Sequence, residues 1–282
     1  MYYYIIDPQK TSQKNFERVQ NQLYSSVAEL RISGEMTRVT SLRTIAQLVD
    51  TAMMRGATTI VAVGNDNTLQ DIINAVGEKD VAVGYVPMEN SELSVILGIP
   101  DIKSACQSLA QRRIEVLDLG QVQGAYFFSK ISIGVSLESV QAKSLFDFSK
   151  FSEASKLKGV PIKMVVDGQY SAQFNVAIGT VFNSRAAKCS ESGIASPTDG
   201  VLDVLLLPSL TSFEAWKYRN ELATGCLEKI PGCAVIHGKQ ILFSSMDGVS
   251  FYIGERVIAK TPINIEVIPN KIKMVVGKDR MF

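Results

Sequence analysis

The most informative segment for the architecture of this chain is Thr58-Thr59-Ile60-Val61-Ala62-Val63-Gly64-Asn65-Asp66-Asn67-Thr68. Its first six residues are β-branched or apolar, which is typical of a strand buried on both faces of a parallel sheet. A polar turn follows, and Thr68 is placed to cap a helix that carries Leu69, Ile72, Ile73 and Val76 on one face. The stretch therefore predicts a strand, a turn and a helix, the repeating unit of an α/β domain.

Strand-like and helix-like segments alternate on both sides of this unit. Further strands are expected at 2–6 and 81–86, because both runs are short and apolar. Helices are expected at 16–30, 42–52 and 102–112, where apolar residues recur every three or four positions. The alternation predicts an N-terminal Rossmann-like, mostly parallel sheet with helices on both sides.

The pattern changes after Ile114. Segments become short, strand-like and separated by Gly, Pro or Ser turns, and only 213–223 has the periodicity of a helix. This pattern is typical of an antiparallel β-sandwich. The sequence thus predicts the fold class α/β plus all-β, with one domain at residues 1–117 and a second at 118–269.

Composition limits the partners. The chain has 282 residues, of which 46% are hydrophobic and 20% charged, and its net charge is +1. No global basic field favours nucleic acid. The first residues lack the pattern of a signal peptide, no apolar run approaches the ~20 residues of a transmembrane helix, and the four cysteines form no CxxC pair. We expect a cytoplasmic protein without a nucleic-acid partner or a transmembrane segment.

The turn Gly64–Asn67 is the first candidate for chemistry. In open α/β sheets, ligands bind where strands end and helices begin, because backbone N–H groups point outward there. Gly and Asn accept positive φ most readily, so this turn can fold into an amide-rich nest with Asp66 at its tip. An ordinary polar turn between a strand and a helix is the alternative interpretation.

Residues Val61–Val76 also resemble the segment V-V-G-G-D-G-T-L-N-E-V-V-N-G-L of the diacylglycerol kinase catalytic domain family. That family includes bacterial lipid kinases and sphingosine kinases and is distantly similar to NAD kinases. Asp66 and Thr68 match its G-G-D-G-T motif, whereas Asn65 and Asn67 stand in place of two family glycines.

Further similarities follow in the family's order over nearly the whole chain. They are Asp7-Pro8, Asp118-Leu119-Gly120, the D-G-x-L-D-V stretch Asp199–Val204, and Gly254-Glu255 followed by Ile265–Pro269. An ordered set of this kind is more specific than any single motif. The chain is identified by this resemblance as a divergent member of the family.

The resemblance implies a site for ATP and Mg²⁺. Residues 1–117, completed by 270–282, would bind the nucleotide, and 118–269 would carry acceptor and metal elements. Asp66 and Glu255 would be catalytic, with Glu255 as the general base. The expected nucleotide-binding residues are Gly64, Asn65, Asp66, Asn67, Thr68, Glu89 and Asn90. Mg²⁺ would be held by Asp199, Val201 through its carbonyl, and Asp203.

At two places the sequence departs from the family pattern, and both departures reduce the support for ATP binding and turnover. The family reads P-L-G-T-x-N-D-F-A-R where this chain has Pro87–Leu93, and Glu89 and Glu92 add negative charge where a polyphosphate would lie. Ile253 replaces the Asp that precedes the family's Gly-Glu. Either the nucleotide pose is altered or the site no longer binds ATP well.

The leading functional hypothesis is ATP-dependent, Mg²⁺-dependent phosphorylation of a hydroxyl of diacylglycerol or a related lipid. The partner would be a lipid substrate at the membrane surface, which requires peripheral docking there. A catalytically silent protein that binds a lipid or nucleotide is the alternative, and a kinase of a soluble acceptor such as NAD is the third hypothesis. A homodimer is compatible with the sequence.

Overall fold

The structure is a computed structural model that describes residues 1–8, 13–135, 157–186 and 195–282. The chain forms two compact units. The first unit contains Met1–Asp118 and Pro269–Phe282, and the second contains Leu119–Ile268. Among the described residues, no helix is both long and apolar enough to cross a bilayer.

The first unit contains a parallel sheet with the strand order β2, β1, β3, β4, β16. The strands are β1 (Tyr2–Ile6), β2 (Gly34–Arg38), β3 (Thr59–Gly64), β4 (Ala82–Pro87) and the second half of β16 (Ile263–Val275). Every residue of β3 and β4 is buried. The unbroken apolar runs seen in the sequence therefore lie at the centre of the sheet, as parallel strands covered on both faces must.

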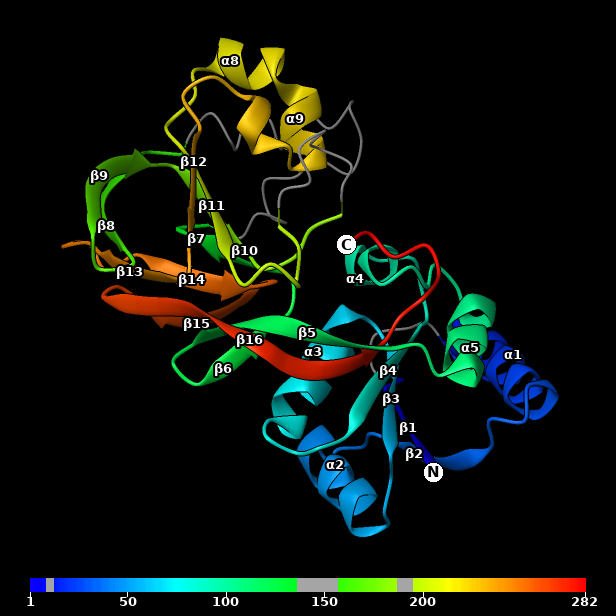
Figure 1. The fold of residues 1–282 in the computed structure, drawn as a ribbon. Coiled ribbons are helices and arrows are strands. Elements are labelled where there is room, and N and C mark those ends of the chain that lie inside the picture. The colour runs from blue at the N-terminus through cyan, green and yellow to red at the C-terminus, as the bar shows by residue number, and fades with distance from the viewer. Residues whose placement is uncertain (9–12, 136–156, 187–194) are drawn as a thin grey trace. The chain divides into compact units, whose positions relative to one another are not determined.

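Helices cover both faces of this sheet (Figure 1). On one face lie α2 (Ile45–Met54) and α3 (Asp66–Val76), and on the other α1 (Gln13–Glu29) and α5 (Ile102–Gln111). The short helix α4 (Glu92–Ile96) follows β4. The expected N-terminal Rossmann-like architecture is confirmed.

Two local features of this unit differ from what the sequence analysis expected. The second helix begins at Ile45, because Thr44 and Gln47 form a reciprocal capping box there, so Leu42 lies outside the helix and is exposed. The strand β2 was not expected at all. Its sequence, Gly-Glu-Met-Thr-Arg, has no apolar run because the strand lies at the edge of the sheet and none of its residues is fully buried.

The second unit is a sandwich of two sheets. One sheet is antiparallel and follows the order β12, β11, β10, β7, β14, β15. Its strands are β7 (Lys130–Ile133), β10 (Ile178–Phe182), β11 (Leu202–Leu207), β12 (Ala234–Gly238), β14 (Ser250–Ile253) and β15 (Arg256–Lys260).

The facing sheet is built around the first half of β16, which pairs with β13. In turn β13 pairs with β8 and β8 with β9, while β5 pairs with β16 and β6. The strands are β5 (Ile114–Val122), β6 (Ala125–Phe127), β8 (Val160–Val166), β9 (Tyr170–Val176) and β13 (Gln240–Ser244). The expected β-sandwich is confirmed.

Alternate residues of β11 face two different cores. Val204 and Leu206 pack into the core between the two sheets, and Leu205 and Leu207 pack into a smaller core with helices on the other face. Those helices are α8 (Ser212–Lys217), α9 (Arg219–Thr224) and the 3₁₀ turn η1 (Leu227–Lys229). The single helix expected at 213–223 is thus two short helices, with a break at Tyr218.

Candidate functional site

Three polar turns leave the first unit's sheet at the same edge. Because β1, β3 and β4 are parallel, with Ile6 paired to Val63 and Gly64 paired to Pro87, their carboxyl ends coincide. Backbone bonds continue this alignment beyond the strands: Asp7 N donates to Val63 O and Met88 N donates to Gly64 O, each at 2.9 Å. This edge is where ligands bind in open α/β sheets.

Helix α3 begins at this edge. Asn65 is its N-cap, and the Asn65 side chain accepts a hydrogen bond of 3.1 Å from Thr68 N. The expectation that Thr68 caps the helix was wrong, because Asn65 can close the first turn three residues earlier. Asn65 has φ −100°, and neither it nor Asn67 is among the residues with positive φ. The turn is therefore an extended residue entering a helix, and the expected left-handed nest does not form.

Thr68 instead joins α3 to the end of β1. Its buried hydroxyl donates to Oδ2 of Asp7 at 3.1 Å. Gly64 makes this approach possible, because a Cβ atom at position 64 would lie 2.4 Å from Oγ1 of Thr68. A glycine at the end of β3 thus serves close packing against α3 rather than positive φ.

Asp66 points toward the turn after β4. Its Oδ1 accepts a hydrogen bond of 2.9 Å from the hydroxyl of Tyr85, and its Oδ2 accepts one of 3.3 Å from Leu93 N. Burial raises the pKa of the Asp66 carboxyl above its usual range, although hydrogen bonds from Ser91, Tyr85 and Leu93 oppose that shift. The carboxylate holds the start of α4 against the start of α3.

Tyr85 and Ser91 were missed by reasoning from the sequence. Tyr85 lies within a run of buried residues, where its ring looks like any other core side chain, and burial raises the pKa of its phenol. Ser91 caps α4 by accepting a hydrogen bond from Ser94 N at 3.2 Å. Its place before Glu92-Leu93 was the available signal, because serine is a preferred N-cap.

Further polar residues of this edge carry carboxylate or amide side chains. Glu89 and Asn90 lie exposed in the turn after β4, and Oδ1 of Asn90 accepts from the Ser94 hydroxyl at 3.2 Å. Within the described part of the three turns and the start of α4, four carboxylates are present, namely Asp7, Asp66, Glu89 and Glu92. This charge opposes a bare polyphosphate but suits one that carries a divalent cation.

The predicted metal ligands of the second unit have other partners. Oδ1 of Asp199 accepts a hydrogen bond of 3.0 Å from Val201 N, which closes a turn before β11. Asp203 is buried on β11 and contacts Nδ1 of His237, its cross-strand neighbour on β12. Across the described residues, no group of three or more His, Cys, Asp or Glu could hold a metal ion. A magnesium site here stays a prediction.

Glu255 lies in the two-residue turn between β14 and β15. Ile253 pairs with Arg256, and Gly254 has φ +58°. Glycine at the first position of such a turn matches the strand twist of a hairpin. The turn leaves Glu255 exposed. Its role as a general base stays a prediction.

The expected site residues thus fall into two sets. All seven expected nucleotide-binding residues lie at the carboxyl edge of the first unit's sheet. Asp199, Val201 and Asp203 lie around the start of β11, and Glu255 lies at the tip of the β14–β15 hairpin of the second unit.

Comparison with known sequences identifies similar proteins. Residues 2–122 match the family described as diacylglycerol kinase catalytic domain. An uncharacterised protein of Synechocystis sp. is 21% identical over 88% of this chain, and the match spans only 61% of that relative's length. A protein of Pseudomonas putida named "Probable lipid kinase YegS-like" is 28% identical over 66% of this chain and 68% of its own.

Solved structures share the fold. A crystal structure of a diacylglycerol kinase from Bacillus anthracis has a TM-score of 0.73 at 15% identity, covering 99% of this chain and 97% of that one. An NAD kinase from Archaeoglobus fulgidus in complex with ATP has a TM-score of 0.58 at 10% identity, covering 100% and 96%. At these identities the likeness shows the architecture alone.

Proposed function

We propose that this chain, whose residues 2–122 belong to the diacylglycerol kinase catalytic domain family, is a lipid kinase. It uses ATP with Mg²⁺ and transfers the γ-phosphate to a hydroxyl of diacylglycerol or a related lipid. The family match and the Pseudomonas relative's name support a lipid-directed phosphotransferase.

One observation supports the nucleotide site above all. Helix α3 begins at Asp66, directly after the central strand β3, at the edge where β1 and β4 also end. A helix N-terminus at this position favours a phosphate, since its first N–H groups have no partner within the helix. The NAD kinase with a similar fold was solved in complex with ATP, which adds support for this ligand.

The acidic residues of the edge fit a nucleotide bound as its magnesium complex. Asp7, Asp66, Glu89 and Glu92 would repel a free triphosphate, and a divalent cation would neutralise that repulsion. Glu89 and Glu92 lie in the turn that follows β4 and in the first turn of α4. Hard oxygen donors of this kind suit Mg²⁺, which usually keeps several waters and the substrate's phosphates as ligands.

Glu255 is the proposed general base. It would accept the proton of the lipid hydroxyl as that oxygen attacks the γ-phosphorus, and the bond from phosphorus to ADP would break. The exposed turn that carries Glu255 leaves the carboxylate open to an acceptor. Ile253 contributes no second carboxylate, so a low rate is expected.

A catalytically silent relative that still binds a nucleotide is the second candidate. The hydrogen bonds of Asp66 favour the silent relative, because the Tyr85 hydroxyl and Leu93 N already donate to the two oxygens of that carboxylate. A side chain held in this way positions α3 and α4 and needs no ligand to do so. The two candidates share the nucleotide site and differ in turnover.

The deciding experiment measures binding and turnover on the same protein. Mg-ATP at roughly 100 times its Kd should stabilise the fold by about 2.7 kcal/mol, which a thermal melt detects easily. Transfer of labelled γ-phosphate to diacylglycerol or sphingosine would support the kinase, and transfer to NAD instead would redirect the proposal to a soluble acceptor. Stabilisation without transfer to any acceptor identifies the silent relative. If Mg-ATP neither stabilises the fold nor supports phosphoryl transfer, that result contradicts the nucleotide site itself.

A further inference from the structure

The side chain of Asn65 folds back over the first turn of α3. Its Oδ1 accepts a hydrogen bond of 3.1 Å from Thr68 N. Thr68 is the third residue of α3, so its N–H is one of the groups that a helix leaves without an intrahelical partner. An anion at the start of a helix binds through such groups. Asn65 therefore already takes a donor that a bound phosphate would use.

The hydroxyl of Thr68 is directed toward oxygens of the chain as well. It lies 3.1 Å from Oδ2 of Asp7 and 3.3 Å from Oδ1 of Asn65. A hydroxyl has one proton to donate, and Thr68 is buried, so this proton stays with one of these two acceptors. Both donors of Thr68 are thus committed to acceptors within the protein.

The rest of the first turn of α3 still favours an anion. The helix has 11 residues, and its dipole places partial positive charge at this end. Asn67, the second helical residue, is exposed. A phosphate that approaches this end meets the dipole, but it finds the N–H of Thr68 closed by the amide oxygen of Asn65.

We propose that Asn65 competes with the phosphates of a nucleotide for the N-terminus of α3 and thereby limits the affinity of the site. This inference rests on the proposed nucleotide site and deepens it, because it names the residue that opposes phosphate binding there. A phosphate oxygen can accept from Thr68 N only after the Asn65 side chain has rotated away. The hydrogen bond that is broken in this step offsets part of the new one.

The competing oxygen can be removed without straining the backbone. Asn65 has φ −100° and ψ −178°, an extended conformation that other residues adopt as readily. Glycine is tolerated at the N-cap and carries no side chain, whereas serine keeps a capping oxygen. Asn65→Gly therefore removes the competitor, and Asn65→Ser retains it in a smaller side chain.

Calorimetric titration with Mg-ATP compares these two variants with the parent protein. Asn65→Gly should lower the Kd about tenfold, because no internal hydrogen bond then has to be broken. Asn65→Ser should bind Mg-ATP like the parent, since its hydroxyl accepts from Thr68 N in the same way. Adenosine carries no phosphate, so its affinity should be the same in all three proteins.

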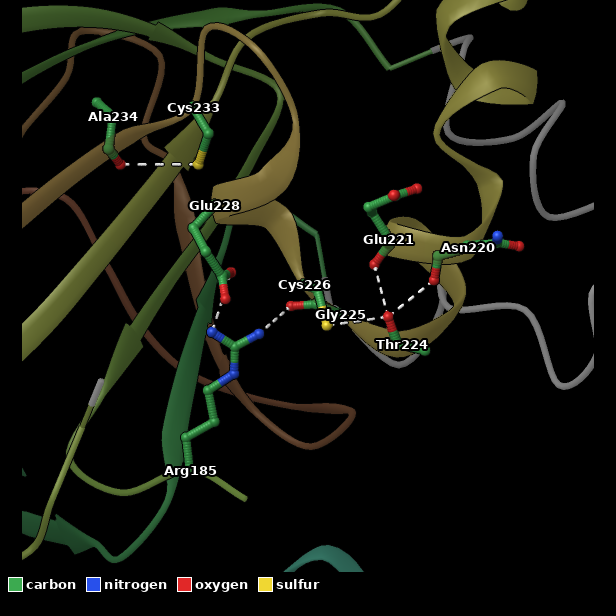
Figure 2. A network of polar contacts seen from close by, with 9 residues as sticks. All are labelled: Arg185, Asn220, Glu221, Thr224, Gly225, Cys226, Glu228, Cys233 and Ala234. Carbon is green, nitrogen blue, oxygen red and sulfur yellow. Dashed lines mark hydrogen bonds and ion pairs between the residues drawn. The ribbon is translucent and has the colours of Figure 1, made fainter. Parts of the chain in front are cut away.

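Thr211→Gly is the matched control, because it removes the N-cap of α8 in the second unit. The surrounding structure should hold, since Ala215 of α8 is buried and Arg185 fixes the segment after α9. The Arg185 guanidinium donates to Oε2 of Glu228 at 3.1 Å and to the carbonyl of Gly225 at 2.6 Å (Figure 2). This variant should bind Mg-ATP like the parent, and circular dichroism checks that every variant is folded.

The outcomes separate this inference from the nucleotide site on which it rests. Equal Mg-ATP affinities for Asn65→Gly and the parent would overturn the inference and leave the site standing. A gain of the same size with adenosine, or in Asn65→Ser, would also overturn it, because the effect would then come from neither the phosphates nor the cap. Binding by Asn65→Gly but not by the parent would support it. If neither protein binds Mg-ATP, the nucleotide site fails and this inference fails with it.

Discussion

Tyr85 donates a hydrogen bond of 2.9 Å from its hydroxyl to Oδ1 of Asp66, across 19 residues of sequence. The bond joins β4 to the first residue of α3. Leu93 N approaches the other carboxylate oxygen, so the same side chain also reaches α4. A residue expected at the tip of a ligand-binding turn thus also organises the turns around it.

Asp66→Asn should flatten the dependence of stability on pH. Burial raises the folded pKa of this carboxyl above its unfolded value of about 3.9. Its contribution to stability is therefore fully present below the unfolded pKa and is lost as pH rises through the folded pKa. The asparagine carries no charge, and its amide can accept from Leu93 N while it donates to the Tyr85 oxygen. Urea unfolding across acidic to neutral pH measures the difference.

Asp101→Asn is the control for that experiment. Asp101 caps α5, and a hydrogen bond from Ser104 N lowers the pKa of its carboxyl, so its stabilisation appears as pH rises. Its replacement should cost stability at neutral pH, whereas Asp66→Asn should not. Parallel pH profiles for Asp66→Asn and the parent protein would show that burial of Asp66 has no energetic consequence.

Gly64→Ala should destabilise the fold by about 1–3 kcal/mol, the usual cost of overpacking. The new Cβ would meet Oγ1 of Thr68 at 2.4 Å and Cβ of Thr68 at 2.8 Å. Thr68→Ala in the same chain removes the nearer atom, so the double variant should lose less stability than the sum of the two single changes. Strict additivity in urea unfolding would contradict a direct contact between the two residues.

Glu255→Gln tests the proposed base. Loss of general-base catalysis costs about 10²–10⁴-fold in rate, and ATP affinity and thermal stability should stay unchanged because the side chain is exposed. Asp247→Asn, an exposed acid in another turn of the second unit, should leave the rate within about twofold, as surface changes rarely exceed ~0.5 kcal/mol. The assay is phosphoryl transfer to a lipid acceptor. Equal rates for both variants would remove Glu255 from the mechanism.

Asp199→Asn tests the proposed magnesium site of the second unit. If Mg²⁺ binds at this turn, millimolar Mg²⁺ should raise the melting temperature of the parent in a saturable way. Asp199→Asn should lose that rise, because a neutral amide is a poorer ligand for a hard cation. Asp247→Asn should keep it. A rise that is identical in all three proteins would place the ion elsewhere.

Much of the fold could be predicted because the buried strands and helices appear in the sequence as local patterns of apolar residues. Thr59–Gly64 and Ala82–Pro87 are apolar without interruption, and both are fully buried central strands. The helix at Ile102–Gln111 begins and ends within one residue of its expected bounds. Edge elements carry a weaker signal, since Gly34–Arg38 needs backbone pairing but little apolar surface.

The candidate site was predictable in its position and not in its contacts. Gly64-Asn65-Asp66-Asn67-Thr68 follows a buried strand and begins a helix, and that order alone places it at the carboxyl edge of the sheet. Both Asn65 and Thr68 can cap a helix, and the sequence offers no means of choosing between them. The role of Thr68 depends on Asp7, which lies 61 residues away in the sequence. Asp7 accepts a hydrogen bond from the Thr68 hydroxyl.

Apolar periodicity is a property of neighbouring residues, so it was enough to locate the strands and helices of the core. The contacts of the polar side chains, in contrast, could be seen only in the folded chain. Tyr85 looks like a core residue until Asp66 is brought to its hydroxyl, and the exposure of Phe213 and Trp216 emerges only once α8 is packed on the sheet. A hydrogen bond or the exposure of a ring depends on residues that are distant in the chain. The local sequence pattern does not indicate which distant residues come into contact.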